Sequence, residues 1–524
     1  METENSKSAV SFIFSKLGKI VKKSDTILFL LTFIFMLLVH MFMFTNKFLN
    51  HDDIMDTLGN CNFAITSGRW FLQPVVSLSG SFSGSWMIGV MGSIYMSVAV
   101  VAIARLFRFK HVFCSALMSL ALVSFPVLAS VNAYMFSADG YMFALMMAAL
   151  SALFIHKEKW WSLLLGIVCL TLSLGCYQAY FALTCSLLLI AVGIDILDRR
   201  WNEKWHYFIF TALKYIGCLV AAMVFYFIIM YISLAVTGKE LVSYKGMDSM
   251  GQLTMRELIS RSITGYKAFF EFYRDYKLPV FHDFFTKLCA VSVLLSLVTA
   301  IGGIVKRKLY RKPILLVWLA CVALVFPLSV DLAYVMTGTS VHILMRYPSV
   351  LLLVLPAIAL DRINIDAAER KKIVSYGATT LAVCLIAVQV VTCGEFMVVT
   401  NRAYFTLDMS YKQTEVYVTK LFTRIEMTEG YEKNTPIALV GPLRVDFNYP
   451  TTNIIGVPTA NDSLNTYSDA RNAMFRYVFG IDRNIAGQDV IDAVKETEKF
   501  KSMPVYPAEG SVENINGVVV VKLS

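Results

Sequence analysis

Charged side chains are scarce in this sequence. They make up 16% of its 524 residues, whereas hydrophobic residues make up 57%. A soluble globular protein carries about 25% charged residues, so this chain has too little polar surface to cover itself in water. The scarcity of charge excludes an ordinary soluble protein and indicates a polytopic membrane protein.

The sequence also has no short motif of the kind that binds nucleotides or metals. It contains no P-loop, no GxGxxG after a predicted strand, no HExxH and no paired CxxC. Its ten cysteines are scattered, most of them within apolar runs, as is typical of small packing residues. His40 and His342 are isolated histidines without metal-ligand spacing, which favours packing or polar contacts. We therefore expect neither a metal nor a cofactor, and no chemistry driven by a nucleotide.

The net charge of +10 is not a sign of nucleic-acid binding. The basic residues fall in short clusters between apolar runs, where they set the orientation of a chain in its membrane. With a cytoplasmic N-terminus, the short outer connections hold only Lys47, Arg69 and Arg346. The clusters expected on the cytoplasmic side are Lys16/Lys19/Lys22/Lys23, Arg105/Arg108/Lys110, Lys157/Lys159, Arg199/Arg200/Lys204, Lys306/Arg307/Lys308/Arg311/Lys312 and Arg362/Arg370/Lys371/Lys372.

Apolar runs long enough to cross a bilayer recur along the chain. A bilayer requires roughly 20 apolar residues per helix. The fifth and sixth runs are nearly continuous, so residues 175–178 must form a tight turn or a broken helix. The first run follows lysines and lacks a cleavage site, which predicts a retained signal anchor. The runs, about eleven by this criterion, are residues 25–45, 85–106, 111–130, 138–155, 160–177, 178–197, 207–236, 284–305, 313–334, 346–361 and 373–398.

These runs divide the chain into two predicted parts. Residues 1–400 form a transmembrane domain, with outer loops at 46–84 and 237–283. Within the second loop, residues 253–272 predict an amphipathic helix at the membrane interface, with basic and aromatic residues interleaved. An odd number of spans puts residues 401–524 outside, where polar composition, strands at 436–441 and 517–523 and a helix at 488–500 predict a small α/β domain.

Asp52 and Asp53 follow directly on the first run, at the outer mouth of a membrane helix. They could be a solvated loop pair or a helix cap, or one of them could be the general base for a sugar hydroxyl. Sixteen residues after Asp53 come Arg69 and Trp70. Both residue types suit an interfacial anchor, but an arginine fork is also the natural ligand of a lipid phosphate. A carboxylate, a cation and an aromatic ring on one side of the membrane indicate that these residues take part in a reaction and do not only pack.

Further polar residues are expected on the same outer side. Asp139 opens a membrane run and is either a helix cap or a costly functional carboxylate. Tyr177 and Gln178 suit sugar hydroxyls, although interfacial tyrosines are common. Arg346 is a second candidate for a phosphate, and Asp331, inside an apolar run, is expected to face the bundle interior.

The order of these motifs resembles the type-II Gtr family of bacterial membrane glucosyltransferases. The resemblance extends over nearly the whole chain, although each motif alone is weakly specific. It rests on Asn50-His51-Asp52-Asp53, Gly68-Arg69-Trp70, Ser137-Ala138-Asp139-Gly140-Tyr141, Tyr177-Gln178-Ala179-Tyr180 and an ending from Met503-Pro504-Val505-Tyr506-Pro507 through Gly510-Ser511 to Val520-Val521-Lys522-Leu523.

This resemblance implies a GT-C type enzyme of the bacterial cytoplasmic (inner) membrane. Such an enzyme takes a sugar, typically glucose, from a polyprenyl phosphate and adds it to a cell-surface glycan such as O-antigen, outside the cytoplasm. It implies an acid in the first outer loop as the base, which matches Asp53, with Asp52 second. In the same scheme Arg69 and Arg346 hold the donor phosphate, and Asp139, Tyr177, Gln178 and Trp70 hold sugar. The partners implied are the lipid-linked donor, the lipid-linked or cell-surface glycan acceptor, membrane lipids, and a donor synthase and flippase.

Two other readings of the sequence stay open. A transporter or flippase of lipid-linked sugar favours polar sites at the bilayer midplane and often internal repeats, whereas the candidates here lie towards one side. A glycan polymerase or ligase is also an outer-face enzyme that uses lipid-linked sugars, and the sequence does not separate it from a glucosyltransferase.

Overall fold

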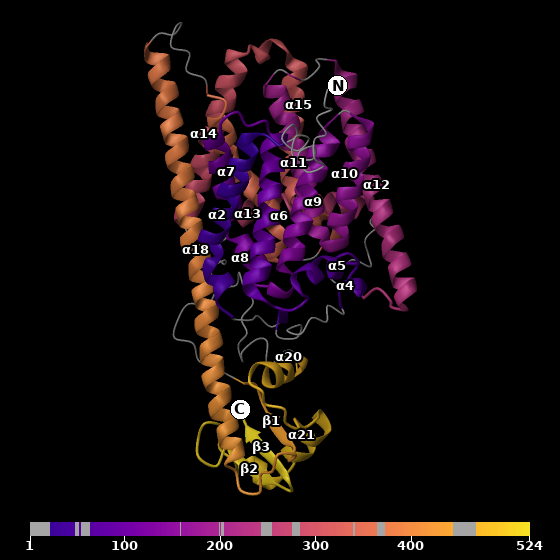
Figure 1. Ribbon diagram of the computed structural model, residues 1–524, viewed down its shortest axis with the longest axis vertical. Helices are drawn as coiled ribbons and strands as arrows, with labels where there is room; N and C mark the ends of the chain where they lie inside the picture. The colour runs from indigo at the N-terminus through magenta and orange to yellow at the C-terminus, as the bar shows by residue number, and fades with distance from the viewer. Residues whose placement is uncertain are drawn as a thin grey trace, which may run out of the picture.

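The computed structural model is a tall bundle of helices with a small sheet beyond one end of it (Figure 1). This architecture confirms the predicted fold class, a polytopic helical protein with a small C-terminal α/β unit. The structure describes residues 21–47, 52–53, 63–157, 159–198, 200, 204–242, 254–274, 283–338, 341–363, 372–443 and 468–524.

Each of the predicted apolar runs is largely helical, although the runs at 111–130 and 313–334 are each divided between two helices. Among the described residues, nine helices are long and apolar enough to cross a membrane, and two shorter apolar helices accompany them. The shorter two are α7 (Val112–Ser124) and α10 (Trp160–Cys176). The nine are α2 (Lys23–Thr45), α6 (Ser85–Leu106), α9 (Met135–His156), α11 (Phe181–Leu197) with the short η2 (Gln178–Tyr180), α12 (Trp205–Thr237), α14 (Asp283–Lys306), α15 (Pro313–Val330), α17 (Val350–Leu360) with η4 (Ile343–Ser349), and α18 (Lys372–Glu426).

Several of these helices are interrupted at residues that the sequence marks. Pro126 disfavours helical geometry at the residue before it, so α7 ends and Phe125 is extended before α8 (Val127–Asn132) begins. Tyr177 is extended between α10 and η2, which confirms the tight turn predicted there. Asp331 separates α15 from α16 (Leu332–Thr337) and is buried, as predicted.

Ion pairs gather cations from distant segments at one end of the bundle, which we call the basic end. There Arg105 pairs with Asp25 at 2.6 Å, and Arg307 pairs with Asp198 at 2.9 Å. Arg108 bonds to Asp195 in the same way. Five of the predicted cytoplasmic cations lie outside the described residues, namely Lys16, Lys19, Arg199, Arg370 and Lys371.

The opposite end of the bundle, which we call the sheet end, carries the short helices. These are α4 (Phe63–Thr66), α5 (Leu72–Val76) and η1 (Ser77–Ser79). The predicted amphipathic helix is present as α13 (Met255–Phe272), which packs against α15 and α16. Its first turn is fixed by a capping box, because Thr254 donates to Glu257 at 2.8 Å and receives the Glu257 backbone N–H. These bonds lower the pKa of the Glu257 carboxyl.

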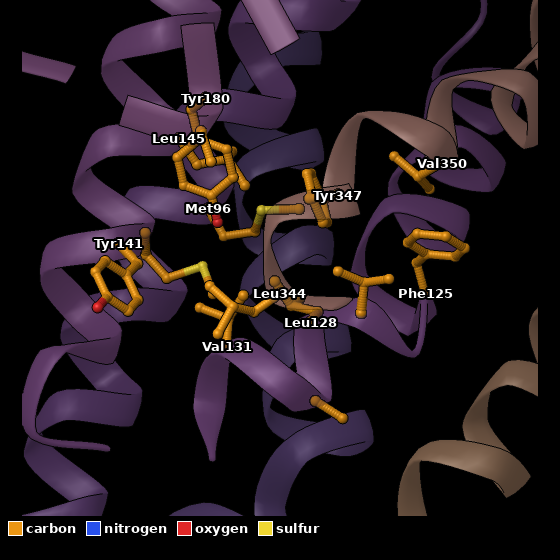
Figure 2. Packing of buried hydrophobic residues seen from close by; sticks show 14 of the residues in the cluster. Met96, Phe125, Leu128, Val131, Tyr141, Leu145, Tyr180, Leu344, Tyr347 and Val350 are labelled. Atoms are coloured by element: carbon orange, nitrogen blue, oxygen red, sulfur yellow. The ribbon is translucent and has the colours of Figure 1, made fainter. Parts of the chain in front are cut away.

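The centre of the bundle is filled by aromatic, aliphatic and methionine side chains (Figure 2). Tyr347 of η4 is fully buried and meets Tyr180 edge to face at 6.2 Å between ring centroids. It also meets Phe125 at 6.3 Å, so the breaks in three helices pack against one another. These contacts fix the chain at the sheet end, where the short helices begin.

The C-terminal unit lies at the end of α18, beyond the sheet end of the bundle (Figure 1). Strands β1 (Ile437–Val440) and β3 (Val518–Lys522), both predicted, pair in parallel, and β2 (Val512–Ile515) adds an antiparallel edge. Asn516 and Gly517, both at positive φ, form the β2–β3 turn, as an Asn-Gly pair favours. The predicted helix at 488–500 is two helices, α21 (Gln488–Lys495) and α22 (Glu498–Ser502), because Thr497 caps a new start. Between β1 and α21 lie α20 (Ser468–Ala473) and η5 (Met474–Val478).

Candidate functional site

A cavity of about 260 Å³ lies at the sheet end of the bundle. Helices α10, α11, α12 and α16, the start of α9 and the segment before η4 contribute to its walls. The predicted site residues among its lining are Asp52, Arg69, Tyr177 and Gln178. The cavity therefore unites four of the eight predicted residues, although they come from segments more than a hundred positions apart.

Asp52 and Asp53 have different surroundings. Asp52 lines the cavity. Asp53 is fully buried, and its Oδ1 accepts the backbone N–H of Phe136 at 2.7 Å. That N–H belongs to the first turn of α9, where a helix has unsatisfied donors and favours negative charge. Of the two acids, Asp52 is the one that lines the cavity, and Asp53 joins the segment after α2 to α9.

Arg69 sits between α4 and α5, in the cavity wall. Its Nη1 donates to the hydroxyl of Tyr141 at 3.0 Å. Its guanidinium carbon lies 5.7 Å from the Tyr141 ring centroid and 5.4 Å from that of Tyr177. These two rings are close neighbours, with centroids 4.4 Å apart. The aromatic pair holds the guanidinium in place by cation–π attraction at the edge of the cavity.

Gln178 is fixed by hydrogen bonds to the segment between α4 and α5 and to α12. Its Nε2 donates to the carbonyl of Ser67 at 3.0 Å and to the hydroxyl of Tyr226 at 3.0 Å. Tyr226 in turn donates to the carbonyl of Gly68 at 3.1 Å. This network binds η2 and α12 to the backbone just before Arg69, so it holds the arginine segment in register.

Trp70 and Asp139 are not among the residues that line the cavity. The Trp70 ring packs against α10, where a Cβ on Gly175 would lie 2.7 Å from it, so only glycine fits. Asp139 is fully buried in α9, and its Oδ1 accepts the backbone N–H of Gly140 at 2.9 Å. Asp139 lies away from the cavity because positions 139 and 141 face different sides of α9, and Tyr141 is on the cavity side.

Arg346 also points elsewhere, although Leu344 and Met345 beside it line the cavity. Its Nη1 donates to the carbonyl of Ala268 at 3.2 Å and lies 3.9 Å from Asp331. The guanidinium therefore joins η4 to α13 and to the break between α15 and α16.

Several lining residues carried no signal that sequence analysis could read. Tyr134 and His342, whose rings meet edge to face at 6.2 Å, both line the cavity. His342 also accepts the backbone N–H of Leu344 at 3.4 Å, which agrees with the polar contacts expected of it. Tyr226 lies inside an apolar run, where one tyrosine among many gives no hint of a site.

One side of the cavity is apolar. Met223, Phe227 and Met230 of α12 line it, at the spacing of one helical face. Leu332 and Met336 of α16 also belong to the lining. Polar groups and apolar side chains thus occupy one cavity, which is the composition expected of a site for an amphiphilic ligand.

Comparisons with known proteins agree with this geometry. Comparison with curated proteins finds no significant match. The family model described as Glucosyl transferase GtrII matches residues 41–353, a range that contains the whole lining of the cavity. With that range covering more than half of its length, the chain belongs to the GtrII glucosyltransferase family and is a multi-pass membrane glycosyltransferase.

Proposed function

We propose that this glucosyltransferase moves glucose from a polyprenyl-phosphate donor to a cell-surface glycan, and that the transfer takes place at the sheet end of the bundle. The proposal rests on the cavity that Asp52 and Arg69 both line, together with an apolar wall. The carboxylate of Asp52 suits an acceptor hydroxyl, the guanidinium of Arg69 suits a phosphate, and the apolar wall suits an isoprenoid chain.

The reaction is a single displacement. The acceptor hydroxyl oxygen attacks the anomeric carbon, and its proton passes to the carboxylate of Asp52 as the new glycosidic bond forms. The bond from the anomeric carbon to the phosphate oxygen breaks, and its electron pair stays on the phosphate. Attack opposite to the leaving group inverts the anomeric centre. A sugar phosphate is already activated, so this step needs no nucleotide.

Arg69 is the proposed ligand of the departing phosphate. Its planar fork suits two phosphate oxygens, and charge grows there as the bond breaks. Tyr141 and Tyr177 hold the guanidinium from behind. Arg346, which bonds to Ala268, is proposed to position η4 instead of binding phosphate directly. The apolar wall of α12 and α16 suits the first isoprene units of the donor.

The sheet end is proposed to face away from the cytoplasm. Among the described residues before residue 400, the basic end carries most of the lysines and arginines, and cytoplasmic connections are enriched in these residues. A donor used on that face must be made and moved across the membrane first. We therefore propose a donor synthase and a flippase as its partners, and the cytoplasmic membrane of a bacterium as its place.

The proposal is tested with purified protein in proteoliposomes that contain polyprenyl-phosphate glucose labelled in the sugar, together with a lipid-linked glycan acceptor. We expect label in the glycan with inversion at the anomeric carbon. Efficient transfer from a nucleotide sugar without the lipid donor would contradict the proposed donor. Movement of the labelled lipid across the bilayer without transfer would favour a flippase.

A further inference from the structure

A second hollow lies near the other end of the bundle. It is a groove of about 930 Å³ between α14 and α15, which are consecutive in the chain. These two helices diverge because α14 packs on α17 and α18, whereas α15 packs on α11 and α13. Apolar side chains make up most of the groove wall, and Leu297, Val322 and Leu355 are examples from three of the helices.

The groove is long compared with one leaflet of a membrane. Its lining on α14 extends from Val293 to Lys306. This stretch is about 20 Å long at 1.5 Å per residue, whereas half of the hydrocarbon core of a bilayer is roughly 15 Å. An acyl chain that lies in the groove can therefore be covered along its whole length.

The basic end of the groove is electropositive. Lys306, Arg307 and Arg362 line it there. Both arginines share one carboxylate, because Asp198 lies 2.9 Å from Arg307 and 3.5 Å from Arg362. The other nearby acid, Asp361, accepts the backbone N–H groups of Lys110 and His111 at 3.0 and 2.9 Å at the start of α7, and it also lies 4.0 Å from Nη1 of Arg362. Lys306, Arg307 and Arg362 still outnumber these two carboxylates.

Two cations at the basic end of the groove can form further hydrogen bonds or ion pairs. The Nε of Arg362 is buried and has no hydrogen-bond partner among the described residues. Lys306 is exposed and makes no ion pair within that part of the chain. Lys308 and Arg311 follow in the hairpin, around η3 (Leu309–Arg311). An anionic group at the mouth would complete the bonding of these cations.

We propose that this groove binds an anionic glycerophospholipid, with its phosphate at Lys306 and Arg362 and its acyl chains along α14 and α15. Basic pockets between membrane helices are the kind of site that anionic headgroups occupy. The headgroup lies at the basic end, whereas the cavity with Asp52 lies at the sheet end, so this lipid is separate from the sugar donor. The site is independent of the proposed sugar transfer.

The chain offers a matched pair of variants for the test. Gly303 of α14 lines the groove, and nothing lies within 4 Å of a Cβ added to it. Gly303→Leu therefore adds a side chain in the groove where its Cβ meets no other atom, and leucine favours the helix. Gly217 of α12 also has nothing within 4 Å and lies outside the groove. Gly217→Leu is the control.

Binding is measured by native mass spectrometry of the purified protein titrated with phosphatidylglycerol or with phosphatidylcholine. We expect a preference for phosphatidylglycerol, a loss of about fivefold in affinity in Lys306→Gln, no binding in Gly303→Leu, and unchanged binding in Gly217→Leu. Equal binding of both lipids, or wild-type binding in Gly303→Leu, would overturn the proposal. Displacement of phosphatidylglycerol by polyprenyl phosphate would also overturn it and would assign the groove to the donor.

Discussion

At the scale of single residues, the adjacent acids Asp52 and Asp53 have different surroundings and are expected to have different roles. Asp52 faces the cavity, and Asp53 is buried against the first turn of α9. Successive residues of a helical turn point in different directions, so only one member of such a pair can face a substrate. The other can then fix the segment that carries it. A pair of acids in sequence is therefore one candidate base and one anchor.

The anchoring role of Asp53 predicts unequal effects of two substitutions. Asparagine keeps an oxygen that accepts the Phe136 N–H, whereas alanine removes it. We expect Asp53→Ala to lower the free energy of unfolding by about 1 kcal/mol, as loss of a helix cap does, and Asp53→Asn to lower it much less. Thermal unfolding of the purified variants in detergent measures this. Equal losses in the two variants would argue against the anchor.

We expect the Arg69→Lys variant to be defective because the shape of the side chain changes, although its charge does not. In Arg69→Lys the cation remains, but the planar fork and its stacking on Tyr141 and Tyr177 are lost. We expect kcat to fall by about 100-fold, the usual cost of one transition-state donor, with an unchanged melting temperature. Arg256→Lys, in α13 and outside the cavity lining, is the control. A rate in Arg69→Lys close to wild type would remove Arg69 from the phosphate site.

At the scale of elements, a buried polar contact joins α18 to the bundle. His40 Nε2 lies 3.0 Å from the carbonyl of Val123, which can only accept, so this nitrogen carries the proton. His40 Nδ1 therefore accepts the hydroxyl of Tyr404 at 2.7 Å. Both side chains are fully buried. The contact links α2 and α18, and α18 continues without a break into the helix that carries the sheet.

This contact predicts coupling between the two residues. Tyr404→Phe leaves a buried acceptor on His40, and His40→Leu leaves a buried hydroxyl on Tyr404, so each single change is costly. In the double variant neither group is left unpaired. We expect the double variant to be more stable than the sum of the single effects implies, by about 1 kcal/mol. Additive losses in thermal unfolding would show that the contact contributes nothing.

The breaks in helices show how far sequence determines elements here. The two runs that meet at Tyr177 are together too long for one span, so the break there was predicted. The break before Pro126 was not predicted, because residues 111–130 were expected to form one run, although a proline disfavours helical geometry at the residue before it. The start of α22 at Thr497 was not predicted, because a threonine within a helical pattern becomes a cap only when its hydroxyl bonds to Phe500. Such a bond depends on the final backbone.

At the scale of the whole molecule, the chain has one basic end and one end with the cavity and sheet. Hydropathy is a local property, and each of the nine described helices that are long and apolar enough to cross a membrane lies on a predicted run. Two of the other predicted runs hold shorter apolar helices. Which residues line the cavity depends on contacts between segments that are far apart in the sequence. Asp52, Arg69, Tyr177 and Gln178, which were predicted to lie on one side of the membrane, line one cavity. The sequence could not reveal that Arg346 would bond to Ala268 or that Tyr226 of α12 would join the lining. Side-chain direction depends on which helices become neighbours. The boundary predicted at residue 400 stays a prediction, and α18 runs through it.

The proposed orientation predicts the behaviour of reporter fusions. Alkaline phosphatase fused after Ser524 should be active, because this enzyme matures only outside the cytoplasm, whereas fusion at Tyr310 in the basic hairpin should be inactive. A green fluorescent protein at the same two positions should give the reverse pattern. Active phosphatase at Tyr310 with an inactive fusion at Ser524 would invert the whole arrangement.

The central claim is that Asp52 takes the proton of the acceptor hydroxyl. Its most direct test is the single-turnover rate of sugar transfer in proteoliposomes with saturating polyprenyl-phosphate glucose, for Asp52→Asn beside Asp53→Asn at equal amounts of folded protein. Loss of a general base costs about 100-fold to 10,000-fold in rate. We predict a loss of that size in Asp52→Asn and a rate within about tenfold of wild type in Asp53→Asn, where the acceptor oxygen for Phe136 remains. Wild-type transfer by Asp52→Asn, or a larger loss in Asp53→Asn, would contradict the assignment.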